Sequence, residues 1–115
     1  MAVTAFDSDT QTCTVTTEHT LASVNEAGVY TLHLDLDDLE AGDALEVRVY
    51  QMILTGGTAR VAYYDIFAGA QHALGKIVIS PPISNDLAVT DALKFTVTQT
   101  LGTSRDIPWK VLKHG

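Results

Sequence analysis

The sequence of 115 residues has one cysteine, few aromatic residues and half as many basic as acidic residues. With Cys13 alone, the chain cannot form an intrachain disulfide. Because Cys13 lies in an alternating run between Thr12 and Thr14, we expect a small buried side chain rather than a reactive thiol. A chain of this length buries roughly two-thirds of the surface it exposes when unfolded. A single domain over residues 1–115 therefore needs neither a disulfide nor a metal ion to form its core.

Long hydrophobic runs are also missing. No apolar stretch approaches the roughly 18 residues that a membrane-spanning helix needs. The first residues, MAVTAFDSDTQ, lack both a basic start and an apolar stretch of signal-peptide length. We therefore expect a protein that is made and kept in a cytoplasm, or assembled there, and that has no membrane partner.

Basic residues are scarce, since 14 acidic residues face 7 basic ones and give a net charge of −7. This charge repels nucleic acid and anionic membranes at long range and favours contact with a basic protein surface. The charges are unevenly distributed. Three basic residues lie in the last eleven positions: Arg105, Lys110 and Lys113. Six acidic residues lie within twelve positions of the first half: Asp35, Asp37, Asp38, Glu40, Asp43 and Glu46.

Sequence motifs for catalysis or metal binding are absent. There is no G-x-S-x-G, P-loop or G-x-G-x-x-G, and no H-x-H or C-x-x-C spacing that would suit zinc. His33 lies two residues from Asp35 on one strand face, roughly 7 Å apart by the strand rise, which is too far for a catalytic pair. We expect no enzymatic activity, cofactor or metal. A pocket joining His33 or His72 to a carboxylate would favour the opposite interpretation.

What the sequence does contain is alternation of apolar and polar residues, with many threonines and β-branched residues. Turn-forming residues separate the alternating segments, and no segment has a helical period. This pattern predicts an all-β fold, an antiparallel β-sandwich or jelly roll of about eight short strands. We expect strands at residues 10–16, 20–24, 30–36, 45–50, 59–67, 76–80, 93–100 and 107–113.

An acidic connection joins the third and fourth expected strands. Asp37-Asp38 and Gly42-Asp43 are typical turn residues, since Asp side chains bond nearby backbone and glycine tolerates positive φ. Three interpretations remain open: a solvated hairpin bend, an acidic contact for a basic partner, and a calcium site. The calcium interpretation is weakened because the glycine and terminal glutamate of the familiar calcium loop are missing.

Apolar residues on the outward faces of two strands predict a protein-binding surface. Met52 and Leu54 continue the outward face that carries Arg48, and Tyr64 and Ile66 lie outward on the next strand. A small sandwich has one interior, so apolar residues on its other face often mark an interface. The alternative is a loop folded over that face.

The aromatic residues raise the alternative of carbohydrate binding. Tyr63 and Tyr64 are adjacent on a strand and point to opposite faces, so they cannot form one stacking platform. Trp109 aligns with the apolar residues Ile107 and Val111, which predicts packing in the core or at a sheet edge. Pro108 favours an edge position for the last strand, because proline cannot donate to a ladder.

Four segments carry a family resemblance: GVYTLHLDLDDLEAGDALEVRVY at 28–50, LTGGTARVAYY at 54–64, KIVISPPIS at 76–84 and LKFTVTQTLGTSRDIPWKV at 93–111. In these segments the chain resembles small β-rich virion proteins encoded among the structural genes of tailed bacteriophages. The most distinctive match is T-Q-T-x-G-T-x-R-x-x-P-W-K-V at 98–111. That family offers no catalytic residues to transfer.

The resemblance implies a structural component of a virion, with a capsid decoration (cement) protein as the first choice. Such a protein binds the major capsid protein outside the shell as a small homo-oligomer. A tail or neck component and a carbohydrate-binding module are the alternatives. We expect the acidic loop to face basic shell residues or the basic tail of a neighbouring copy, and residues 107–112 to pair across subunits. The candidate interface comprises Asp35, Asp37, Asp38, Glu40, Asp43, Met52, Leu54, Tyr64, Ile66, Arg105, Trp109, Lys110 and Lys113.

Overall fold

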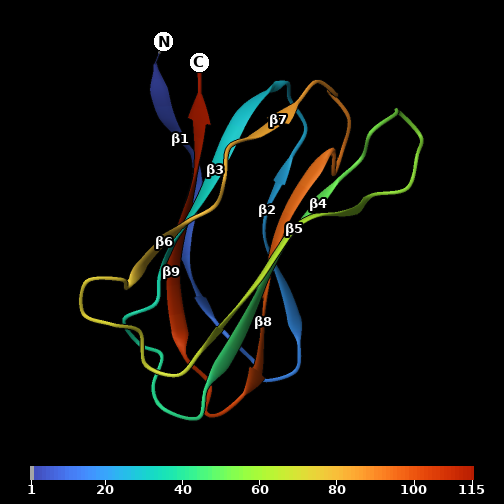
Figure 1. Ribbon diagram of the computed structural model, residues 1–115. Coiled ribbons are helices and arrows are strands. Elements are labelled where there is room, and N and C mark those ends of the chain that lie inside the picture. Colours follow the sequence, from blue (N-terminus) through green and yellow to red (C-terminus); the bar gives the residue numbers. More distant parts are fainter. Residues whose placement is uncertain (1) are drawn as a thin grey trace.

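The computed structural model describes residues 2–115, and over that range the chain forms nine β-strands and no helix (Figure 1). Nothing within residues 2–115 forms a helix of the length and hydrophobicity needed to cross a bilayer. The strands are β1 (Val3–Thr12), β2 (Glu18–Val24), β3 (Gly28–Asp35), β4 (Ala44–Gln51), β5 (Arg60–Ala68), β6 (Ile77–Ile79), β7 (Ile83–Asn85), β8 (Leu93–Leu101) and β9 (Asp106–His114).

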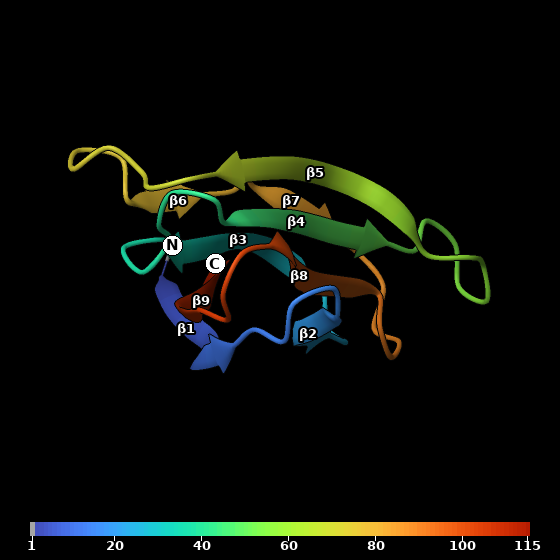
Figure 2. The ribbon, with the colours of Figure 1, turned by 90° about the horizontal axis from the view of Figure 1, so that it is seen from below.

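The strands form two antiparallel sheets that pack face to face, so the predicted antiparallel β-sandwich is confirmed (Figure 2). The first sheet has the order β1-β9-β3-β6, with β7 also paired to β3. The second sheet has the order β2-β8-β4-β5. Figure 2 shows β1 and β2 at one side of the sandwich, and β5 with β6 and β7 at the other. The shortest dimension of the molecule is 19 Å, which fits two sheets about 10 Å apart with their outer side chains.

The core lies between the sheets, because alternation along each strand turns one row of apolar side chains inward. Leu32 on β3, Val47 on β4, Phe95 on β8 and Val111 on β9 are all fully or almost fully buried. Burying a side chain of this size stabilises the fold by about 1.5–3 kcal/mol relative to leaving it exposed. Figure 1 shows that both sheets run the length of the molecule, so one core holds them together.

The first strand was predicted at the wrong residues. The pairing of β1 with β9 runs from Val3 opposite His114 to Thr12 opposite Asp106, so the strand lies earlier than residues 10–16. After Thr12 the chain turns through a positive φ at Thr16 and crosses to the second sheet. Cys13 is buried as predicted, although it lies beyond the strand, where its N–H donates to the Arg105 carbonyl at 2.9 Å.

The prediction that the last strand lies at an edge was also wrong, because β9 lies between β1 and β3. Pro108 is tolerated there for a local reason. The N–H of Thr10, opposite Pro108, donates to the Asp9 carboxylate rather than to β9. Pairing of β3 with β9 stops at Leu34 opposite Trp109, so no ladder bond requires the N–H that proline lacks. A strand paired on both sides has no open edge, so residues 107–112 cannot pair with another subunit.

Two further predictions need correction. The fourth strand ends at Gln51, so Met52 and Leu54 do not continue its outward face. They lie in the loop to β5, where Met52 N–H donates to the Ala92 carbonyl and Leu54 is 74% exposed. The short strand β7 was not predicted, because three residues after Pro81-Pro82 are too few to show alternation.

Candidate protein-binding surfaces

The loop between β3 and β4, residues 36–43, is half core and half surface. Leu36 and Leu39 are buried against the inner faces of the sheets. Asp37, Asp38 and Glu40 are exposed between and beside them. The predicted hairpin was wrong, because β3 and β4 lie in different sheets, and the two leucines anchor the loop as it crosses from one sheet to the other.

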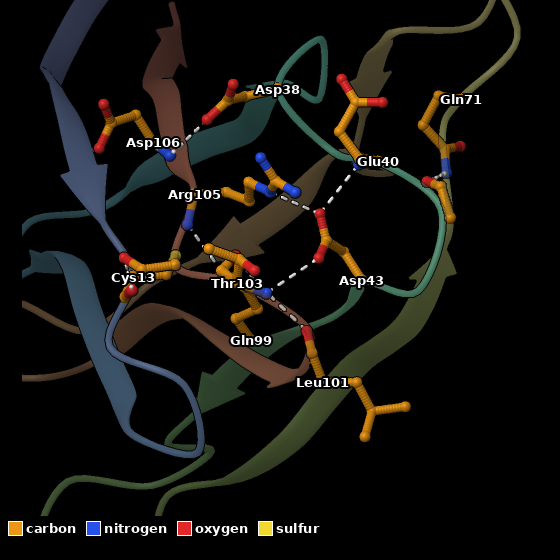
Figure 3. Close-up of polar contacts among 12 residues, drawn as sticks. Cys13, Asp38, Glu40, Asp43, Gln71, Gln99, Leu101, Thr103, Arg105 and Asp106 are labelled. Atoms are coloured by element: carbon orange, nitrogen blue, oxygen red, sulfur yellow. Dashed lines mark hydrogen bonds and ion pairs between the residues drawn. The ribbon is translucent and has the colours of Figure 1, made fainter.

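Asp43 is the main exception to the expected acidic surface, because it is only 3% exposed (Figure 3). One carboxylate oxygen accepts bonds from the Glu40 N–H at 2.9 Å and the Arg105 Nε at 2.6 Å. The other accepts the Thr103 N–H at 3.1 Å. Burial opposes the charge on Asp43, but these hydrogen bonds and the Arg105 charge outweigh it and lower its pKa. Asp43 therefore holds two loops together and is withdrawn from any partner.

Gln99 completes this arrangement from β8 and is fully buried. Its amide NH₂ donates to the carbonyls of Leu101 and Thr103, and its carbonyl accepts the Arg105 N–H at 3.0 Å. Figure 3 shows Gln99 and Asp43 on either side of the β8–β9 turn. Because buried polar groups are costly when unpaired, this shared network fixes the shape of the turn.

Five further acidic residues lie at one end of the sandwich, which we call the acidic end: Asp35, Asp37, Asp38, Glu40 and Asp106. Glu46 lies apart from them, on β4 beside Arg48. Four of the five residues of the acidic end line a shallow hollow of about 250 Å³ beside Pro108. Asp37 pairs with Lys76 at 2.5 Å, and Asp38 accepts the Asp106 N–H at 2.9 Å. Within residues 2–115, no group of three or more His, Cys, Asp or Glu side chains is arranged to hold a metal ion. The acidic end is a concentrated negative surface at one end of the sandwich.

The expected basic tail is largely engaged within the chain. Arg105 bonds Asp43, and Lys113 pairs with Glu26 at 2.9 Å. Within residues 2–115, Lys110 takes part in no ion pair. Arg105 and Lys113 are therefore not available to the acidic loop of a neighbouring copy without breaking bonds of their own.

A second hollow, of about 430 Å³, lies on the outer face of the first sheet and is open to solvent. It is lined by Ser8, His33, Leu34, Asp35, Ile77, Pro108, Trp109 and Lys110. His33 and His114 both bond the Thr31 hydroxyl at 2.9 Å. Burial, Lys110 and His114 lower the pKa of His33. His33 and Asp35 both line this hollow, which is the arrangement named above as favouring an enzyme, but the hydrogen bonds of His33 within residues 2–115 include none to a carboxylate.

Trp109 is 8% exposed and packs in the core with Ile107 and Val111, as the alternation predicts. Its ring is therefore not displayed as a platform for a sugar. Tyr63 and Tyr64 point to opposite faces, also as predicted: Tyr63 packs against the core, and Tyr64 lies outward. The basis for a carbohydrate site made of these rings is accordingly lost.

Comparison with known proteins adds no family to these observations. No protein-family model matches the chain, and no curated protein and no solved structure does. The surfaces described above are therefore interpreted on their own chemistry.

The outer face of β5 carries the expected Tyr64 and Ile66, together with Val61, which was not expected there and is turned outward by the bulge at Ala62. Val61, Tyr64 and Ile66 point outward and are 47%, 46% and 50% exposed. The Tyr64 hydroxyl donates to Glu46 at 2.6 Å, and the Arg48 guanidinium lies over the Tyr64 ring at 5.6 Å. Tyr64 and Ile66 are thus brought together with Val61, whereas Met52 and Leu54 lie apart from them in the loop.

Exposed apolar residues also lie on the first sheet, where the sequence pattern had not predicted them. Ile77 and Ile79 on β6 point outward beside Asp35 and His33, and more than half of each is exposed. Their strand is too short for its two faces to be assigned from alternation alone. The available signal was the run Ile77-Val78-Ile79. In a strand the middle residue and its two neighbours point to opposite faces, and here Val78 packs against the core, so the two isoleucines point outward.

Proposed function

We propose that this protein is a non-enzymatic structural component of a tailed-phage virion, and within that class a capsid decoration protein. The observation that carries the proposal is the presence of two outward apolar rows, one on each outer face of the sandwich: Val61, Tyr64 and Ile66 on β5 of the second sheet, and Ile77 and Ile79 on β6 of the first. Exposed apolar clusters of this kind favour burial against another polypeptide. The resemblance of residues 28–50 and 93–111 to virion proteins supplies the class of partner.

The acidic end supports a basic partner surface such as that of a major capsid protein. Charge complementarity there would set register and orientation more than affinity, and it would weaken at high salt. A tail or neck component is the nearest alternative, and the two differ in copy number. A decoration protein is present in a fixed ratio to the capsid protein, whereas a neck protein is present in a few copies per particle.

The experiment is quantitative mass spectrometry of purified particles from the phage that encodes this chain. We expect a fixed, high ratio of this protein to the major capsid protein. A few copies per particle would favour the tail or neck alternative. Finding the protein in the host cytosol and absent from particles would overturn the proposal.

A charge-reversal variant tests the role of the acidic end. Asp37→Lys with Asp38→Lys should weaken binding to particles while leaving the fold intact, because both carboxylates are exposed. Asp43 must be left unchanged, since its reversal would place a second cation against Arg105 inside the protein. The matched control is Asp7→Lys with Asp9→Lys on β1, which makes the same change of charge away from the acidic end. Equal binding by both double variants would show that the acidic end has no role in assembly.

A further inference from the structure

The strand β5 forms an unusually open edge. It pairs with β4 on one side, and within the described residues 2–115 no strand pairs with its other side. One extra residue, Ala62, forms a bulge near its start, and the six residues from Tyr63 to Ala68 then run in regular register with β4. The outward row of Val61, Tyr64 and Ile66 follows this edge.

The other edges of the sandwich are blunted. On β1 the pairing shifts register near Phe6, and carboxylates cap two outward N–H groups, those of Ser8 and Thr10, whereas on β5 one is capped, that of Ile66. The edge strand β2 also contains a register shift. Strands β6 and β7 are three residues each and are separated by two prolines. Bulges, short strands, charges and prolines all discourage pairing with another chain. The strand β5 also has a bulge, at Ala62, but its outward residues Val61, Tyr64 and Ile66 are apolar, so it is the edge best suited to pairing.

The backbone groups of β5 show which residues face outward along the ladder. The Ile66 N–H donates to the Asp65 carboxylate at 2.9 Å, so it points away from β4. In an antiparallel strand, alternate residues direct their N–H and C=O groups to the same side. Tyr64, Ile66 and Ala68 therefore direct their backbone groups to the open edge, and pairing at Ile66 requires its N–H to exchange the Asp65 carboxylate for a carbonyl of the incoming strand.

We propose that β5 pairs antiparallel with β5 of a second copy of this chain, about a twofold axis at Tyr64. The pairing joins the second sheets of the two copies into one continuous sheet and brings their outward apolar rows together. It rests on the proposed function and deepens it by naming the contact between copies. A twofold contact of this kind uses the same surface on both partners, and an antiparallel strand pair satisfies that symmetry.

Charge favours a second copy over an unrelated strand. Arg60 begins β5 and makes no ion pair within residues 2–115. At the other end of β5, Gly69 N–H donates to the Asp43 carbonyl, next to the acidic end. Antiparallel pairing places Arg60 beside the partner's Ala68 and so close to the partner's acidic end. It also holds the two acidic ends apart, which limits repulsion between chains of net charge −7.

The position of Asp65 restricts the register. An axis at Asp65 would set two carboxylates directly opposite each other, which destabilises a strand pair. An axis at Tyr64 instead sets Asp65 opposite the partner's Tyr63, and within one chain the Tyr63 hydroxyl already bonds Asp65 at 3.3 Å. The Tyr64 ring is held by Glu46 and Arg48 before association, so little side-chain freedom is lost on pairing.

The first test is the oligomeric state of the purified protein by sedimentation velocity over the micromolar range. We expect a dimer that dissociates on dilution. Tyr64→Lys or Ile66→Lys should raise the dimer dissociation constant about tenfold or more, since edge lysines oppose strand pairing. Thr10→Lys on the β1 edge is the matched control and should leave it unchanged. Circular dichroism of each variant confirms that the sandwich is folded.

The second test detects the contact between copies directly, by a cross-link, and does not depend on weakening it. Residues opposite each other at a twofold strand pair have Cα atoms about 5.5 Å apart, which a disulfide can span. Tyr64→Cys should therefore form a disulfide-linked dimer under mild oxidation, whereas Ser8→Cys on β1 should not. The native Cys13 does not interfere, because burial, reinforced by Asp106, raises the pKa of its thiol to about 11.

Two outcomes would overturn the pairing: a wild-type protein that is monomeric throughout this range, or a dimer that the β5 variants leave unchanged. These outcomes are independent of the proposed function. A monomer found in a fixed ratio to the capsid protein would remove the pairing alone. A β5 dimer absent from particles would remove the virion role alone.

Discussion

At the scale of single residues, Asp43 shows how an apparently exposed acidic residue can be part of the architecture. It joins the β3–β4 loop to the β8–β9 turn through two hydrogen bonds, from Thr103 and Arg105, and accepts a third from Glu40 within its own loop. We expect Asp43→Asn to lower the free energy of unfolding by about 2–4 kcal/mol, because the new amide NH₂ faces donors and leaves Arg105 without its partner. Urea denaturation measures this change. Asp38→Asn, at an exposed carboxylate, should cost less than about 1 kcal/mol.

The same residue gives the protein a dependence on pH. The pKa of Asp43 is lowered from its ordinary value of 3.8 in the folded protein, so the unfolded chain binds its proton more readily. The stabilisation is therefore complete above the unfolded pKa and is lost as pH falls through the folded pKa. Thermal midpoints measured from pH 6 downwards should fall steeply below about pH 4 in the wild type and less steeply in Asp43→Asn. Equal slopes for the two proteins would contradict this role.

Gly102 is required beside Asp43 for steric reasons. Its φ is +95°, and a Cβ at this position would lie 1.9 Å from the Asp43 carboxylate oxygen and 2.8 Å from the Asp43 Cα. We expect Gly102→Ala to destabilise the protein by about 2–4 kcal/mol, as measured by urea denaturation. Gly42→Ala is the matched control, because Gly42 also has a positive φ of +91° but has open space around its Cβ position. That variant should cost only about 1–2 kcal/mol.

At the scale of strands, alternation with a period of two was sufficient to predict the positions of the long strands and insufficient to predict those of the short ones. The expected strands at 30–36, 45–50, 59–67 and 93–100 agree with β3, β4, β5 and β8 to within one or two residues at most ends. The position of β9 inside its sheet could not be predicted. Pro108 is tolerated there because no residue opposite it needs its missing N–H, and the sequence does not show which residues lie opposite. Asp43 was misplaced for a similar reason, since its partners Thr103 and Arg105 are about sixty residues away in sequence.

The arrangement of strands predicts unequal local stability. Strands β3, β8 and β9 are paired on both sides, whereas β6 and β7 are short, paired on one side and partly exposed. In native-state hydrogen exchange we expect the amides of Leu32, Phe95 and Val111 to exchange slowest, near the limit set by global unfolding. The amides of β6 and β7 should exchange much faster. Equal protection of the two groups of amides would contradict the predicted difference in local stability.

At the scale of the whole molecule, one core shared by both sheets predicts cooperative unfolding. Trp109 is the single tryptophan and lies on the inner face of the first sheet, so its fluorescence reports on the core. Far-ultraviolet circular dichroism reports on the strands of both sheets. We expect the two signals to follow the same urea transition, since a domain with one core unfolds as a unit. Separate midpoints would show that one sheet can lose its structure before the other.

The contrast between the β4–β5 loop and the loop at residues 36–43 has a practical consequence. The β4–β5 loop projects beyond the sheets (Figure 2), and its Ile53 and Leu54 are largely exposed. The loop at residues 36–43 instead supplies buried leucines and the Asp43 bonds. A foreign peptide grafted between Gly56 and Gly57 would consequently be displayed with little cost to folding, while the same graft beside Leu39 would disrupt the interior. The β4–β5 loop is thus suited to carry epitopes or affinity tags, whereas the loop at residues 36–43 is needed for the stability of the fold.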